Sequence, residues 1–363
     1  MCLTSQSIFV NGGGALTKNM RTKTIMVNQC VPGMRISRDL FSKANSLIIP
    51  AGTILDEYSI RRLDDLLIPY VDIYEMTEIE IETAAQSFEK EYSTHLGSIK
   101  DIFASLDSGN MLRMETVRSA VGGVIGSNIG HRDVLHTLNG LRSVDGYTYT
   151  HSLNVGILAM MLARWSGISE DRVKQICYAG VLHDIGKARV PEHILNKPGK
   201  LSPEEFAVVK KHSVAGYDIL KQNATIAEDI RQGVLMHHER IDGRGYPLGV
   251  TGDKINEYAR IVAIADVFDA MVSDRCYKLK ESPFNVLEHF ENQCLGHLDP
   301  KFLGVFIEKM SVYFLGEQVR LSDGREAKVV FINPHILSRP MIQIGDVVLD
   351  LSKEKNISIA QLA

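Results

Sequence analysis

The stretch that decides the fold runs from residue 237 to 247: His237-His238-Glu239-Arg240-Ile241-Asp242-Gly243-Arg244-Gly245-Tyr246-Pro247. It places two adjacent imidazoles and two carboxylates ahead of a tight glycine-rich turn. A second cluster of the same chemical kind lies upstream, His183-Asp184-Ile185-Gly186-Lys187. Neutral imidazoles combined with carboxylates suit divalent first-row transition metals. The two stretches together therefore predict a metal centre.

The composition is that of a folded protein without a general attraction for polyanions. Of the 363 residues, 45% are apolar, which is enough for a sizeable core and for two or three domains. The formal net charge is only −4, so any anionic ligand must be held by local charges or by metal. The acidic balance, together with the absence of a basic stripe with interleaved aromatics, argues against a nucleic acid polymer as partner.

The cysteines and the apolar runs bear on where the protein works. The five cysteines are odd in number and show no Cys-x-x-Cys spacing. This pattern is typical of reduced thiols and predicts a cytoplasmic protein. The sequence has no apolar run of about 18 residues, so no membrane span is expected. The N-terminus also lacks the basic and apolar blocks of a secretory signal.

Changes in the spacing of apolar residues divide the chain into five predicted segments. They are a flexible lead (1–25), a small α+β domain with a regulatory or dimer-forming role (26–77), a helical connector (78–144), a domain of consecutive helices (145–314) and a short β-rich tail (315–363). The connector could form a dimer stalk or simply pack on the next domain, and the sequence weights these alternatives equally. The fold class expected is mainly α, and a homodimer stays open.

Local signals mark where some elements begin and end. Ser202-Pro203-Glu204-Glu205 is a capping box with proline at the first helical position, and it predicts a helix running to about Leu220. A helix from about residue 171 to 184 is expected to stop at Gly186 in a left-handed cap. In the tail, Asp323-Gly324 between two apolar runs predicts a hairpin with a type I′ turn.

Polar residues inside apolar helices supply further candidate ligands. Residues 257–272 are apolar nearly all round, which predicts a buried helix with Asp266 inside it. A buried carboxylate is costly without a partner, and either a metal ion or a hydrogen bond from a neighbouring helix would provide one. His151 in its apolar helix is equally ambiguous, and His212 beside two lysines could be a surface residue. The order of all the candidate ligands along the chain changes the balance between metal ligation and these other roles.

That order is His151, His183-Asp184, His212, His237-His238 and Asp266. It resembles the HD superfamily of metal-dependent phosphohydrolases, and Gly245-Tyr246-Pro247 narrows the resemblance to the HD-GYP family. The resemblance covers roughly residues 140–312. It implies an all-helical catalytic domain, a site for two or three metals, and hydrolysis of the bacterial messenger cyclic di-GMP to linear pGpG. Further cleavage to GMP stays open.

The resemblance also implies how the metals are held. All seven of these side chains match metal ligands of the family, and Asp184 matches the carboxylate that bridges two ions and serves catalysis. Family members with a third metal carry a glutamate where this chain has Tyr147, which favours two ions. The ligands admit iron, manganese, nickel or zinc, and the family favours iron or manganese. A hydroxide held between the ions would attack the phosphorus.

The resemblance extends to side chains that would contact the substrate. Lys187 is expected to serve catalysis by binding a phosphate oxygen or the attacking water. Arg275 and Lys278 match positions that grip phosphate, the arginine as a fork and the lysine as a point charge. Nearby Cys276 departs from the common proline and is expected to alter a turn near the substrate without abolishing activity.

The signature loop itself is expected to contribute contacts. Tyr246 could stack on a guanine or pack the loop down, and Arg244 is a weaker candidate for a substrate contact. The Gly245-Tyr246-Pro247 loop could also dock a protein partner. Glu239 is expected to orient a ligand histidine.

Two other functions stay open from the sequence. One is the same chemistry on another cyclic dinucleotide such as cyclic GMP-AMP, because no residue that reads the base is identifiable. The other is a receptor or scaffold that binds cyclic di-GMP without cleaving it. The intact ligand set argues against the receptor, because degenerate members are expected to lose His-Asp or His-His.

Overall fold

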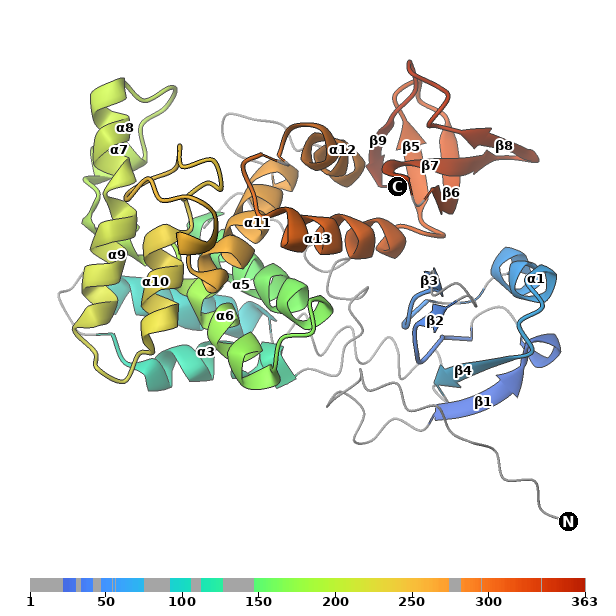
Figure 1. Ribbon diagram of the computed structural model, residues 1–363, viewed down its shortest axis with the longest axis horizontal. Coiled ribbons are helices and arrows are strands. Elements are labelled where there is room, and N and C mark those ends of the chain that lie inside the picture. The colour runs from blue at the N-terminus through green and yellow to red at the C-terminus, as the bar shows by residue number, and fades with distance from the viewer. Residues whose placement is uncertain are drawn as a thin grey trace, which may run out of the picture.

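The computed structural model describes residues 22–30, 34–41, 47–53, 55, 57–74, 92–105, 112–126, 147–273, 282–294, 296–333 and 335–362. The protein is mainly helical, with a small α+β part at its N-terminal end and a β-sheet at its C-terminal end, as predicted (Figure 1). Figure 1 shows the helices gathered on one side of the view and the two strand-containing parts on the other.

The N-terminal part has its own small core. Its elements are β1 (Thr22–Met26), η1 (Val27–Gln29), β2 (Leu40–Phe41), β3 (Leu47–Ile49), α1 (Glu57–Asp65) and β4 (Tyr70–Tyr74). β1 pairs antiparallel with β4, and β2 pairs antiparallel with β3. Ile36, Ile49 and Leu63 are buried between them. Residues 22–25, which the sequence assigned to a flexible lead, lie in the first of these strands.

The connector packs on the main helical core over the residues that the structure describes. Residues 92–105 are helical, and α3 (Met114–Gly126) follows. Ile99, Ile102 and Phe103, which share one face, are all buried in the same core as the central helices. The Phe103 ring also meets the Tyr149 ring edge to face, with centroids 5.4 Å apart. These contacts favour packing over a free stalk for this helix.

The central helices surround the chemically active residues. They are α5 (Tyr147–Trp165), α6 (Glu170–Leu182), η2 (Ile185–Arg189), α7 (Glu192–Leu195), α8 (Pro203–Lys210), α9 (His212–Lys221), α10 (Glu228–Met236), η3 (Gly252–Lys254), α11 (Glu257–Val272), α12 (Pro283–Gln293) and α13 (Pro300–Tyr313). α11 has the predicted bounds and is buried along most of its length. None of the helices in the described ranges is both long and apolar enough to cross a membrane.

Two glycines let α5 and α6 approach closely. A Cβ atom on Gly156 would lie 2.4 Å from Val181 Cγ2, and one on Gly180 would lie 2.8 Å from the Gly156 Cα atom. Any larger residue at either position would push the helices apart. This close crossing brings the rings of His151 and His183 to a centroid separation of 5.1 Å.

The helix boundaries differ from the sequence expectation at two places. The capping box at Ser202 is present, but the helix that it starts breaks at Lys211 and resumes as α9 at His212. Gly186 is not a left-handed cap, because its φ is not positive and it lies in η2 after α6 has ended at Leu182. Its role is close approach, since a Cβ there would lie 1.9 Å from the His212 carbonyl oxygen.

The C-terminal sheet is antiparallel with strand order β8-β7-β6-β5-β9. Its strands are β5 (Gln318–Leu321), β6 (Glu326–Asn333), β7 (Ile336–Ile344), β8 (Val347–Asp350) and β9 (Ile359–Leu362). The predicted hairpin forms, but its turn is not type I′. That turn needs positive φ at Asp323 and Gly324, and only Gly324, at +88°, has it. Arg339 pairs with Glu288 of α12 at 2.9 Å and ties the sheet to the helices.

Candidate metal centre

Three imidazoles sit at helix ends and make the same backbone contact. His183 follows α6, His212 lies at the break between α8 and α9, and His237 follows α10. Each Nδ1 lies 2.7 Å from the carbonyl oxygen three residues earlier, those of Gly180, Val209 and Val234. Because a carbonyl only accepts, Nδ1 must carry the hydrogen and donate it. Each Nε2 is therefore left with its lone pair directed away from its own helix end.

One group of ligand atoms comes from the long core helices. It consists of His151 of α5, His183 after α6 and Asp266 of α11, whose ligand atoms lie within 4.8 Å of one another. His151 Nε2 is 3.0 Å from Asp266 Oδ1, and His183 Nε2 is 3.9 Å from the same oxygen. We call this set the first ligand group.

A second group comes from the region of α9 and α10. It consists of His212, His237 and His238, whose ligand atoms also lie within 4.8 Å of one another. The Nε2 atoms of His212 and His237 are 3.3 Å apart, and the rings of His237 and His238 are 4.0 Å apart between centroids. We call this set the second ligand group.

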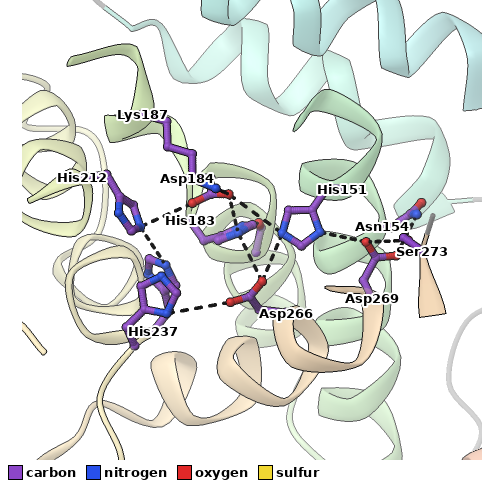
Figure 2. Close-up of polar contacts among 12 residues, drawn as sticks. His151, Asn154, His183, Asp184, Lys187, His212, His237, Asp266, Asp269 and Ser273 are labelled. Atoms are coloured by element: carbon purple, nitrogen blue, oxygen red, sulfur yellow. Dashed lines mark hydrogen bonds and ion pairs between the residues drawn. The ribbon is translucent and has the colours of Figure 1, made fainter. Parts of the chain in front are cut away.

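Asp184 stands between the two ligand groups (Figure 2). Its Oδ2 lies 3.2 Å from His183 Nε2 and 3.9 Å from His151 Nε2 in the first group. Its Oδ1 lies 3.4 Å from His212 Nε2 in the second group. One oxygen of the carboxylate thus faces each group, which is the arrangement that a bridging ligand requires.

The carboxylates of the cluster are held in their anionic form. Burial alone would raise the pKa of Asp184, but His183 and the Lys187 ammonium together hold it well below its usual range. Burial likewise opposes ionisation of Asp266, and the hydrogen bond from His151 and the nearby imidazoles outweigh it and lower that pKa. Both groups therefore bear negative charge in the pH range where proteins work.

Four of the imidazoles fall into two electrostatic classes. Burial lowers the pKa of His212 and of His237, and lowers that of His238 to about 4. For His151, burial also acts to lower the pKa, but hydrogen bonds to Asp266 and Asp269 prevail and raise it to about 9. The second ligand group is thus made of neutral imidazoles, which is the form that binds metal ions.

The side chains present fit a divalent-metal centre. The Nε2 atom of His183 is buried and makes no hydrogen bond with any residue that the structure describes, which is costly for a lone pair with no donor or cation beside it. Two ligands at about 2.1 Å from one ion and about 90° apart would be about 3.0 Å from each other. His151 Nε2 and Asp266 Oδ1 have this separation.

The structure brings some of the expected substrate contacts to the cluster and leaves others away from it. Lys187 Nζ donates to Asp184 Oδ2. The Tyr246 ring lies 4.6 Å from the His238 ring, at an interplanar angle of 31°. The Arg244 side chain is exposed and does not join the cluster, and its backbone N–H donates to Asp242. Arg275, Cys276 and Lys278 fall outside the described residues, as does the side chain of Tyr147.

Glu239 anchors the signature loop. This buried carboxylate accepts hydrogen bonds from the backbone N–H groups of Leu248 at 2.6 Å and Gly249 at 3.1 Å. Its contacts are thus with the loop backbone, whereas the sequence led us to expect contact with a ligand histidine. Gly245 completes the fold of the loop, since a Cβ there would lie 2.4 Å from the Arg240 backbone nitrogen.

The sequence did not single out Asp269, which holds the outer nitrogen of His151. His151 Nδ1 donates to Asp269 Oδ2 at 2.8 Å, and Asn154 Nδ2 donates to Asp269 Oδ1 at 2.9 Å. A carboxylate on the outer nitrogen fixes the ring orientation of a ligand histidine. The sequence did contain a signal for this role. Asp269 is a second acidic residue about one helical turn after Asp266, in a helix that is otherwise too apolar to face water.

Comparison with known proteins agrees with this geometry. Residues 138–302 match the family model described as "HD domain". Over 249 residues the chain is 34% identical to the cyclic di-GMP phosphodiesterase PA4108 of Pseudomonas aeruginosa, covering 68% of this chain and 59% of that protein. It is 35% identical over 176 residues to 3'3'-cGAMP-specific phosphodiesterase 2 of Vibrio cholerae, covering 48% of this chain and 34% of that protein. The chain thus spans less than two thirds of either relative.

A solved structure shares the fold. It is that of Bd1817, a HDG"Y"P protein from Bdellovibrio bacteriovorus, which superposes with a TM-score of 0.52 at 18% sequence identity. The match covers 80% of this chain and 99% of that one, so the likeness extends beyond the central helices.

Proposed function

We propose that this chain, which belongs to the HD-GYP family of metal-dependent phosphohydrolases, hydrolyses cyclic di-GMP to linear pGpG. Whether the linear dinucleotide is cleaved further to GMP stays open. The observation that carries the proposal is the position of Asp184, with one oxygen toward each of two groups of imidazole and carboxylate ligands. The name of the Pseudomonas relative supports cyclic di-GMP as the substrate.

Seven side chains would hold two divalent ions. The first ligand group and Asp184 Oδ2 would hold one ion, and the second ligand group and Asp184 Oδ1 the other. Iron or manganese is proposed, with nickel or zinc compatible with the same ligands. When bound, such ions supply a water of lowered pKa and positive charge against the phosphoryl oxygens.

The chain's own residues then position the diester. Lys187 Nζ lies against Asp184 Oδ2, with 26% of its side chain exposed, so the ammonium can reach a phosphate oxygen or the attacking water from the rim of the cluster. Arg275 and Lys278 are proposed to bind phosphate oxygens, to which a guanidinium offers two parallel hydrogen bonds. Together these cations would orient the scissile bond and offset its charge.

The signature loop is proposed to close one side of the site. The Tyr246 ring packs on His238 and lies 5.4 Å from Lys210 Nζ. These contacts support the packing role of the tyrosine, with its exposed remainder and Arg244 as candidate base contacts. The same proposal includes a protein partner that docks on this loop, a regulatory role for the N-terminal part, a homodimer and a cytoplasmic location.

A second candidate substrate is 3'3'-cyclic GMP-AMP. The observation that favours it is the 35% identity to the Vibrio protein that is named as specific for that dinucleotide. Both substrates share the phosphodiester ring that the metal centre would attack, so the base contacts alone would separate them. A receptor that binds without cleaving is disfavoured by the complete ligand set.

The test is hydrolysis by anaerobically purified protein, with the metal quantified in the same sample. Cyclic di-GMP and 3'3'-cyclic GMP-AMP are compared side by side, and products are separated by chromatography. We expect linear pGpG, about two metals per chain, and loss of both in the His183→Ala/Asp184→Ala variant. His193→Ala, which removes an exposed histidine outside the cluster, is the matched control. Fully metallated protein that binds cyclic di-GMP without cleaving it would contradict the proposal.

A further inference from the structure

A chain of three hydrogen bonds leads from the connector to the first ligand group. The Tyr92 hydroxyl donates to Asn154 Oδ1 at 2.7 Å, and Asn154 Nδ2 donates to Asp269 Oδ1 at 2.9 Å. His151 Nδ1 then donates to Asp269 Oδ2 at 2.8 Å (Figure 2 shows the part from Asn154 onward). Each of these four side chains is at most 3% exposed, so water does not substitute for any of the partners.

The Asn154 amide lies between the Asp269 carboxylate on one side and the Tyr92 hydroxyl on the other. Asn154 can help Asp269 only if its NH2 group, and not its carbonyl oxygen, faces the carboxylate. The carboxylate only accepts and therefore selects this orientation, and the Tyr92 hydroxyl holds it in place by donating to the carbonyl oxygen. The Ser273 hydroxyl adds a further donor, 3.2 Å from Asp269 Oδ2. The carboxylate is thereby fixed with Oδ2 toward His151.

Tyr92 belongs to a part of the chain that supplies none of the seven candidate ligands. It opens the described helix 92–105, which is held against the central helices by Ile99, Ile102 and Phe103. The last strand of the N-terminal part, β4, ends at Tyr74. The helix that carries Tyr92 is therefore the first described element between the N-terminal part and the metal centre.

We propose that Tyr92 is a positioning residue for the metal centre. Through Asn154 and Asp269 it holds the His151 ring with Nε2 directed at the other members of the first ligand group. Retention of the ion in that group thus depends on the packing of helix 92–105 against the central helices. The inference rests on the metal-binding part of the proposed function and is independent of which dinucleotide is cleaved.

The test is metal affinity of the full chain, measured by competition against a chelator with Mn²⁺. Tyr92→Phe removes one hydroxyl and keeps the ring in the core. We expect Tyr92→Phe to lower the affinity for the ion of the first ligand group about 3- to 10-fold. Asp269→Asn puts an NH2 group against either His151 or Asn154 and should lower that affinity about 10- to 100-fold. Tyr149→Phe removes the hydroxyl of a ring that contacts Phe103 of the same helix. It leaves the three hydrogen bonds from Tyr92 to His151 intact, so it should retain the wild-type affinity.

A second readout separates positioning from a general loss of stability. With Co²⁺ in place of Mn²⁺, the visible absorption bands report the ligand field, and Tyr92→Phe should shift them while Tyr149→Phe does not. Excess metal should also restore turnover of Tyr92→Phe. Wild-type affinity and spectrum in Tyr92→Phe, or equal losses in both tyrosine variants, would overturn the inference. Failure of the wild-type protein to cleave cyclic di-GMP would instead count against the proposed function, because the affinity measurement does not use substrate.

Discussion

The two ligand groups are built in different ways. The first takes its side chains from α5, α6 and α11 inside the core, and His151 is backed by the buried carboxylate of Asp269. In the second, His212 and His237 donate to backbone carbonyls, as His183 does in the first, and the side chain of His238 is 27% exposed beside the signature loop. For the proposed function, the first group would hold an ion inside the core, and the second would face incoming substrate.

The largest expected effect comes from the residue that the two groups share. Asp184→Asn removes the charge that both groups need, so we expect turnover to fall by about three orders of magnitude or more and both ions to be lost. Turnover and metal content of the same preparation are the measurements. Asp218→Asn, at an exposed position on α9, is the control. If Asp184→Asn kept both ions, the bridging role would be wrong.

Next is a glycine on which the placement of the second group depends. A Cβ at Gly186 would lie 1.9 Å from the His212 carbonyl oxygen and 2.4 Å from the Gly216 nitrogen, both backbone atoms. We expect Gly186→Ala to lower the free energy of unfolding by about 3 kcal/mol, as measured by urea denaturation, and to weaken the second group more than the first. Gly304→Ala, inside α13 and with nothing within 4 Å of the added Cβ, should not destabilise the fold, because alanine favours a helix more than glycine does. Equal stability of the two variants would refute this account.

A direct comparison of the groups follows from single histidine deletions. We expect His238→Ala to weaken one ion about 100-fold and leave the other in place, because its partly exposed ring can be lost without opening the core. His183→Ala should weaken metal binding and also destabilise the fold, because its ring is 1% exposed. Calorimetric metal titration and thermal unfolding distinguish them. Identical behaviour of both variants would remove the proposed difference between the groups.

The smallest expected effect concerns the loop beside the second group. Glu239→Gln keeps an acceptor for the Leu248 and Gly249 amides but removes its charge, which should loosen the loop by about 1–2 kcal/mol. Hydrogen exchange of those two amides should speed up accordingly. Glu228→Gln, at an exposed position on α10, should leave them unchanged. Unaltered exchange in Glu239→Gln would show that the carboxylate does not anchor the loop.

What the sequence predicted well are features that depend on local pattern. The capping box at Ser202 and the buried helix 257–272 are where they were expected. The seven ligand candidates do converge, because their order follows a known family pattern. Composition and spacing alone left His151 and His212 ambiguous.

What the sequence could not predict depends on contacts between distant segments. The helix breaks at Lys211, and His212 then lies at the start of α9 beside the cluster. No capping signal in the sequence predicts this break. Gly186 was assigned a conformational role, whereas the crowding by His212 is visible only once α9 is in place. Tyr92 and Asn154 meet across 62 residues of sequence, and no periodicity encodes that pairing.

His183 and His237 cap the C-terminal ends of α6 and α10, and this placement has an electrostatic consequence for the order of events. The carbonyl end of a helix carries partial negative charge, and here two such ends add to the ionised carboxylates of Asp184 and Asp266. Lys187 and His151 offset part of this negative charge, and what remains attracts divalent cations more than it attracts a phosphodiester. For the proposed function, bound ions would supply the positive charge that an anionic substrate needs. We therefore expect the ions to bind first and the nucleotide second.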